Sequence, residues 1–144
     1  MIEQQACKVA QPTGSGPRHA VLHGDILVTL REYSTIITSQ LVPPLVQNIC
    51  DTVSNLLIVP EDQASLQGAK FVASEALIPS ASAEFSALLY ASNRNTGPNG
   101  DPRGGVVAVF VLDAVDGKHQ IISQFFTGLK QVRGCNSVNR ITGS

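Results

Sequence analysis

Apolar residues along this chain come in short runs separated by turn residues, a pattern typical of β-strands. Short runs rich in Val, Ile, Thr and aromatic residues, bounded by Gly, Pro, Asn, Asp or Ser, predict strands. The strongest run is Val106–Leu112, which predicts a buried strand. The expected strands are 19–22, 26–30, 34–42, 71–78, 87–93, 106–112 and 120–126.

One segment, Val46–Val59, is ambiguous between helix and strand. Its apolar residues fall close to helical spacing, at Ile49, Val53, Leu56 and Leu57. Pro43 and Pro44 precede the segment and Pro60 follows it, which leaves little room for a helix. We therefore expect mainly strand here.

The segment 16–32 predicts a β-hairpin, with one strand on each side of a tight turn at His23-Gly24-Asp25. In an antiparallel hairpin the start of one strand lies beside the end of the other. Arg18 stands at the start and Glu32 at the end, so we expect these two side chains to lie close together. His19 and His23 alternate with Ala20 and Leu22, which suggests that the histidines face away from the apolar side and stabilise the hairpin.

The strand pattern recurs along the chain. Similar segments open at Arg18, Ser74 and Arg133, at intervals of 56 and 59 residues, and each full unit holds about four strands. This repeat predicts an all-β fold made of β-propeller blades, a fragment of two to three blades. The expected parts are a blade tail at 1–15, blades at 16–60 and 68–127, and the start of another blade at 128–144. A β-sandwich is the alternative for several short strands joined by turns.

A propeller closes its ring only with about four to eight blades. The chain holds fewer, and Cys7–Ala10 and Val132–Val138 resemble parts of neighbouring blades, so we expect an interior piece of a longer protein. On its own, the piece would expose the apolar faces of Ile26–Leu30 and Val106–Leu112 together with unpaired strand edges. We expect it to be unstable or to self-associate.

Composition limits the classes of binding partner and the cellular compartment that we expect for this protein. The net charge of the 144 residues is −1, and no apolar run approaches the roughly 20 residues that span a bilayer, so we expect neither nucleic acid nor membrane as a partner. The start of the chain lacks the basic and apolar regions of a signal peptide. Cys7, Cys50 and Cys135 are widely spaced and odd in number, which favours a reduced, cytoplasmic protein without a disulfide framework. We expect no metal and no cofactor.

Three segments carry a family resemblance: Gly14–His23, Leu89–Asn95 and Phe126–Gly134. In this order and spacing they resemble the seven-bladed β-propeller lactonase family. The branch they most resemble is the fungal 3-carboxy-cis,cis-muconate cyclases, with 6-phosphogluconolactonase-like relatives. The resemblance implies a closed propeller of which this chain supplies a middle part. It also implies a catalytic histidine in an earlier blade, so that this piece alone would be inactive.

The resemblance also implies a site. Arg18 opens a blade, Glu32 ends the following inner strand and Arg94 ends the equivalent strand of the next blade, so these three are the expected catalytic residues. Glu75 and Arg133 are expected to line the channel and bind substrate. The implied activity is that of a cycloisomerase, an intramolecular lyase that closes a carboxylated muconate to a lactone. The alternatives are a lactone hydrolase of the 6-phosphogluconolactonase type or an inactive fragment.

The chemistry of these residue types fits an anionic substrate. Arginine stays charged at all working pH values and grips carboxylates with two parallel hydrogen bonds, and a glutamic acid in such a site can act as acid or base. Each residue also has a structural alternative: a salt bridge for Arg18 and Glu32, an exposed turn residue for Arg94, and a paired structural carboxylate for Glu75. The chain departs from the family at the shorter His23-Gly24-Asp25 turn and at Arg31, where relatives carry a smaller or apolar residue.

Overall fold

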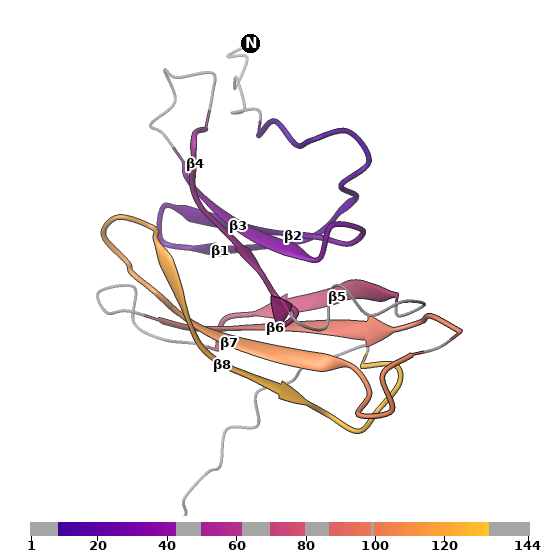
Figure 1. Cartoon of the computed structure of the whole chain (residues 1–144). Helices are drawn as coiled ribbons and strands as arrows, with labels where there is room; N and C mark the ends of the chain where they lie inside the picture. Colours follow the sequence, from indigo (N-terminus) through magenta and orange to yellow (C-terminus); the bar gives the residue numbers. More distant parts are fainter. Residues whose placement is uncertain (1–8, 43–49, 62–69, 80–86, 99, 133–144) are drawn as a thin grey trace, which may run out of the picture.

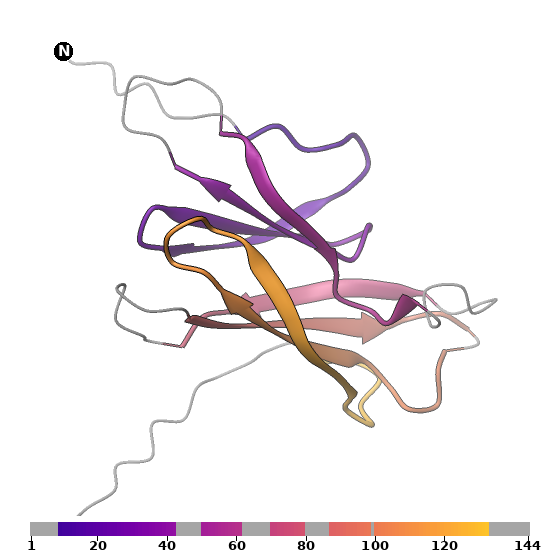
Figure 2. The same ribbon diagram turned by 60° about the vertical axis from the view of Figure 1, so that its left-hand side comes forward.

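The computed structural model describes residues 9–42, 50–61, 70–79, 87–98 and 100–132. These residues form eight strands in two four-stranded antiparallel sheets, and one sheet is stacked on the other (Figures 1 and 2). In each sheet every strand pairs with its neighbour in the chain, so each sheet is a simple meander. The predicted Cys7–Ala10 and Val132–Val138 strands fall mainly outside the described residues.

The first sheet consists of β1 (Pro17–His23), β2 (Ile26–Arg31), β3 (Ile36–Leu41) and β4 (Thr52–Leu57). The preference for strand over helix in the ambiguous segment is confirmed, because β4 lies there and pairs with β3. The hairpin turn is shorter than expected. His23 still belongs to β1 and pairs with Ile26, so only Gly24 and Asp25 make the turn.

The second sheet consists of β5 (Phe71–Leu77), β6 (Ala87–Asn95), β7 (Val106–Leu112) and β8 (His119–Phe126). The strand expected at 106–112 has the bounds that the sequence indicated. The strands of the two sheets fall within the two expected blades, 16–60 and 68–127, whose boundaries stay a prediction.

The core lies between the two sheets. Val28, Leu30 and Ile37 from the first sheet and Leu89 and Phe110 from the second are fully buried there. The expectation that Ile26–Leu30 and Val106–Leu112 expose apolar faces is wrong. Each sheet covers the inward face of the other, so two blades bury an apolar layer even without a closed ring.

The orientation expected for the two histidines is also wrong. His19 pairs with Leu30 and His23 with Ile26, so both side chains face the second sheet, whereas Leu22 is exposed. Val21 lies between the two histidines on the same face of β1 and pairs with the buried Val28, so regular pairing from His19 to His23 turns this face to the core. Nδ1 of His19 accepts a hydrogen bond of 3.0 Å from the backbone N–H of Ala76, which ties β1 to β5.

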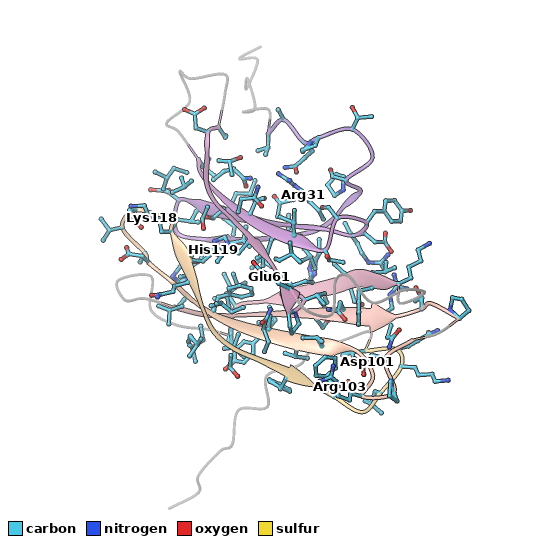
Figure 3. The ribbon with its side chains drawn as sticks, in the orientation of Figure 1. Arg31, Glu61, Asp101, Arg103, Lys118 and His119 are labelled. Carbon is cyan, nitrogen blue, oxygen red and sulfur yellow. The ribbon has the colours of Figure 1, made fainter. Side chains whose placement is uncertain are left out.

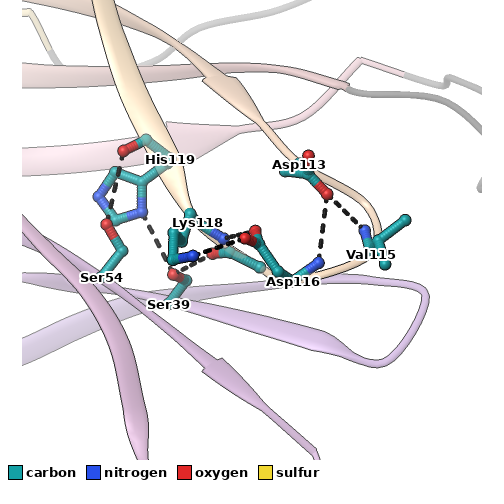
Figure 4. A network of polar contacts seen from close by, with 8 residues as sticks. Ser39, Ser54, Asp113, Val115, Asp116, Lys118 and His119 are labelled. Carbon is teal, nitrogen blue, oxygen red and sulfur yellow. Dashed lines mark hydrogen bonds and ion pairs between the residues drawn. The ribbon is translucent and has the colours of Figure 1, made fainter.

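His119 makes a second polar connection between the sheets (Figure 4). Its Nδ1 lies 3.2 Å from the hydroxyl of Ser39 in β3, and that hydroxyl also donates to the backbone carbonyl of Gly117. The single hydroxyl proton of Ser39 is used on Gly117, so Nδ1 of His119 carries a proton and donates to the Ser39 oxygen. Burial lowers the pKa of His119 to about 4, and the backbone carbonyl of Ile37 offsets only part of that effect.

The loop before His119 is held in shape by its own side chains. Oδ1 of Asp113 accepts hydrogen bonds from the backbone N–H groups of Val115 and Asp116, and Asp116 pairs with Lys118 at 2.8 Å. Gly117 has a φ of 71°, which favours glycine, and it packs against Leu41 and Ile26 of the first sheet. The shape of this loop therefore places His119 against the first sheet.

Cys50 is disulfide-bonded, which contradicts the expectation of reduced cysteines. Separation along the sequence does not limit which cysteines meet, because a disulfide depends on distance and direction in the folded chain. Cytoplasmic localisation stays a prediction. Among the described residues, no helix is long and apolar enough to cross a membrane.

Self-association also stays a prediction, but the surface that would carry it changes. Leu88 and Phe125 are exposed on the face of the second sheet that points away from the first, where Phe125 pairs with Val107. We expect Phe125→Gln to lower the apparent mass of the isolated chain in sedimentation experiments. Val115→Gln is the matched control, because Val115 is exposed in a turn outside this face. Equal association of both variants would exclude the face as the contact.

Candidate functional site

Glu32 stands directly after β2, at the junction of the two sheets. Its backbone N–H donates to the carbonyl of Gly16 at 2.6 Å, and its own carbonyl accepts from the N–H of Ala73 at 3.0 Å. The first bond extends the β1–β2 hairpin and the second joins Glu32 to β5. The backbone of Glu32 is therefore held by strands of both sheets before its side chain makes any contact.

Two guanidinium groups bind the same oxygen of Glu32. Nη1 of Arg18 lies 2.8 Å from Oε1, and Nη2 of Arg94 lies 2.6 Å from it. Arg18 comes from β1 and Arg94 from β6, so the cluster joins the two sheets. The expected proximity of Arg18 and Glu32 is confirmed, and Arg94 lies in the same cluster. The catalytic role of the three residues stays a prediction.

The two arginines differ in their surroundings. The side chain of Arg94 is 15% exposed and that of Glu32 is 18% exposed, whereas that of Arg18 is 42% exposed. Arg18 is also held by a hydrogen bond from its Nε to the carbonyl of Ser74, at 3.1 Å. Nε of Arg94 is buried and has no hydrogen-bond partner in the described part of the chain. Arg94 is thus a largely buried strand residue, and its interpretation as an exposed turn residue is wrong.

The cluster carries one surplus positive charge, because two guanidinium groups share one carboxylate. Both bonds go to Oε1, and no hydrogen bond to Oε2 is found among the described residues. The second carboxylate oxygen of Glu32, Oε2, is therefore available to a ligand beside two fixed positive charges. Such an arrangement can bind an anionic group and exchange a proton with it or with a water molecule.

The two expected substrate-binding residues are Glu75 and Arg133. Glu75 is half-buried in β5, opposite Ser92 of β6. Arg133 lies outside the described residues. The substrate-binding roles of Glu75 and Arg133 stay predictions.

Several polar residues that support the site had no signal in the sequence. Asn93 is fully buried beside Arg94, and its Oδ1 accepts a hydrogen bond of 3.0 Å from the N–H of Val106. The carbonyl that fixes Arg18 belongs to Ser74, one residue before Glu75. An alternating pattern places such residues on a strand but does not reveal what they contact across the sheet.

A cavity of about 380 Å³ lies beside the end of β6, lined in part by Asn95, Asp101 and Lys130. Asp101 is engaged there by Arg103 through several hydrogen bonds, the shortest of 2.7 Å, and these bonds lower the pKa of Asp101. Arg103 also stacks over Phe126 at 3.8 Å. These contacts shape the loop after β6. In the described part of the chain, no group of three His, Cys, Asp or Glu residues is arranged to hold a metal ion.

A scan against protein-family models and a search of curated proteins give no match. Among solved structures, a Lactobacillus plantarum protein is 25% identical over 80% of this chain, with a TM-score of 0.58. A putative 6-phosphogluconolactonase from Bacteroides fragilis is 19% identical over 81%, with a TM-score of 0.57. The periplasmic gluconolactonase of Pseudomonas aeruginosa is 20% identical over 78%, with a TM-score of 0.60.

These likenesses establish the fold class. The two sheets are β-propeller blades, and the β-sandwich alternative is excluded. The chain spans 29% of the L. plantarum protein and 27% of each of the two lactonases. The lactonase part of the sequence resemblance is thereby supported, and the closer likeness to muconate cyclases stays a prediction.

Proposed function

We propose that this chain forms part of an enzyme that interconverts a lactone and its open-chain carboxylate, with Arg18, Glu32 and Arg94 at the reacting end of the substrate. The observation that carries the proposal is the carboxylate of Glu32 between two guanidinium groups from two blades. Two of the structural neighbours are named as lactonases, which supports a lactone as one side of the reaction.

In lactone hydrolysis, water adds to the ring carbonyl carbon and the ring C–O bond breaks. The water loses one proton and the departing alkoxide gains one, so a single proton carrier is sufficient. Oε2 of Glu32 is suited to that role, because Oε1 is held by the two arginines. The guanidinium groups of Arg18 and Arg94 can stabilise the negative charge that develops on the carbonyl oxygen.

The second candidate is the cycloisomerase that closes a carboxylated muconate. A substrate carboxylate oxygen forms a bond to one carbon of a C=C bond, and a proton is delivered to the other carbon. Glu32 would supply this proton in its acid form. The surplus positive charge of the cluster favours this candidate, because the substrate carries several carboxylates. Glu75 and Arg133 would contact the remaining substrate groups in either reaction.

Kinetics of the full-length protein that carries this chain separate the two reactions. We expect turnover of an acidic sugar lactone or of 3-carboxy-cis,cis-muconate, with the preferred substrate showing the higher kcat/KM. Turnover of neither substrate by the folded protein would leave the third alternative, a propeller without this activity.

Arg94→Lys should raise KM by roughly ten- to a hundredfold, because lysine keeps the charge but loses the two-pronged geometry of the guanidinium. Steady-state kinetics on the preferred substrate measure the effect. Arg103→Lys is the matched control, since Arg103 also pairs with a carboxylate but stands outside the cluster. If both variants keep the KM of the unmodified enzyme, Arg94 does not bind substrate.

A further inference from the structure

Arg31 is a buried arginine on the opposite side of the first sheet from the Glu32 cluster. It ends β2 and is 6% exposed, and its neighbour Leu30 faces the core. Arg31 therefore points away from the second sheet, toward the outer side of the molecule (Figure 3). The same outer face holds further buried polar side chains of the first sheet, namely Thr29, Thr38 and Gln40.

The guanidinium of Arg31 has one hydrogen bond. Its Nε donates to Oε1 of Gln11 at 2.6 Å, and neither Nη1 nor Nη2 has a partner in the residues that the structure describes. The four ion pairs found there involve other side chains, so none of the described carboxylates pairs with this arginine. Burial lowers the pKa of Arg31, because it removes water from the cation.

Two more unused donors lie on the segment that covers Arg31. The amide of Gln11 has a fixed orientation, because a guanidinium has only donors and must face the amide oxygen. Nε2 of Gln11 is consequently left as a buried donor without a partner, as is the hydroxyl of Ser15. Ser15 lies next to the Pro17–Arg31 pair, since its carbonyl accepts from the N–H of Tyr33.

We propose that Arg31, Gln11 and Ser15 bind a small oxyanion, a carboxylate or a phosphate group, at a site separate from the Glu32 cluster. The free Nη1 and Nη2 form a fork that matches two oxygens of such a group, and the amide and hydroxyl donate to the others. The segment containing Gln11 and Ser15 already covers Arg31, so an acidic side chain from another sheet would have to displace that segment to reach the guanidinium.

Thermal unfolding of the chain in phosphate and in chloride, at matched ionic strength and pH 7, tests the proposal. Saturating phosphate should raise Tm by about 3–6 °C, because a ligand that binds only the folded state stabilises it. Arg31→Met should abolish the rise. Lys130→Met, which removes a positive charge at an exposed position, should keep it. Arg94→Met should also keep it, which separates this site from the Glu32 cluster.

Gln11→Glu supplies a second variant that does not depend on Arg31→Met folding. A carboxylate at position 11 would pair with Arg31 and take the place of the anion. We expect Gln11→Glu to raise Tm in chloride and to remove the response to phosphate. An equal effect of phosphate and chloride on the unmodified chain would overturn the proposal, and so would a phosphate response that persists in both Gln11→Glu and Arg31→Met.

Discussion

Replacing Glu32 by glutamine should lower kcat of the full-length enzyme by roughly 10²–10⁴-fold, the usual contribution of a general acid or base. Glutamine keeps the shape of the side chain, but its amide cannot act as a general acid or base. The substitution also leaves the guanidinium groups of Arg18 and Arg94 without their shared carboxylate. A loss of about 1–3 kcal/mol in the free energy of unfolding should accompany it.

The two effects are separated by correcting kcat for the folded fraction and by a matched variant. Asp101→Asn removes another buried carboxylate that pairs with an arginine, but it lies outside the cluster. It should lower stability while leaving kcat of the folded enzyme unchanged. If Glu32→Gln behaves in the same way, the cluster is a structural ion pair between blades.

Stability should fall as the pH is lowered from about 6.5 toward 4, because His119 is neutral in the folded protein. The pKa of His119 is lowered to about 4 by burial, whereas an exposed histidine in the unfolded chain titrates near 6.5. As the pH falls, the unfolded chain therefore takes up this proton at a higher pH than the folded protein does. Above about pH 6.5, His119 does not lower the free energy of unfolding. The full loss of free energy, roughly 3 kcal/mol, is reached below the pKa that His119 has in the folded protein.

The variant that tests this assignment is His119→Gln. Its side chain can still donate to Ser39 but does not titrate, so its free energy of unfolding should stay nearly constant between pH 6.5 and 4.5. Urea unfolding across this range measures the difference. Asp101 and Asp116 also contribute to stability, but because their pKa values are lowered, these contributions are lost only below the range of pH 6.5 to 4.5. A wild-type curve as flat as that of the variant would show that His119 is not the responsible group.

The parts of the fold that depend on local sequence could be predicted. The apolar run at Val106–Leu112 and the turn residues around it define a strand wherever the sheet is placed. The proximity of Arg18 and Glu32 likewise follows from a single hairpin, because antiparallel pairing joins the start of one strand to the end of the next. The class of fold followed from the repeat of such local units.

The parts that depend on contacts between the sheets could not be predicted. His19 and His23 face the core because they share a face with Val21, and the sequence alternation alone does not decide whether that face or the face of Ala20 and Leu22 meets the second sheet. Arg31 looks like an ordinary strand-end arginine until the segment at Gln11 is seen to cover it. Burial lowers the pKa of His119, and the ring contacts Ser39, 80 positions earlier in the chain, a contact on which sequence spacing carries no information.

The most direct measurement is a crystal structure of the full-length protein with the open-chain carboxylate product bound. We expect the product carboxylate within roughly 3 Å of a guanidinium nitrogen of Arg18 or Arg94, with Oε2 of Glu32 within hydrogen-bond distance of the hydroxyl group released from the ring. A product that occupies another position, such as the cavity lined by Asp101 and Lys130, while the three cluster residues keep only one another as partners, would contradict the proposed site.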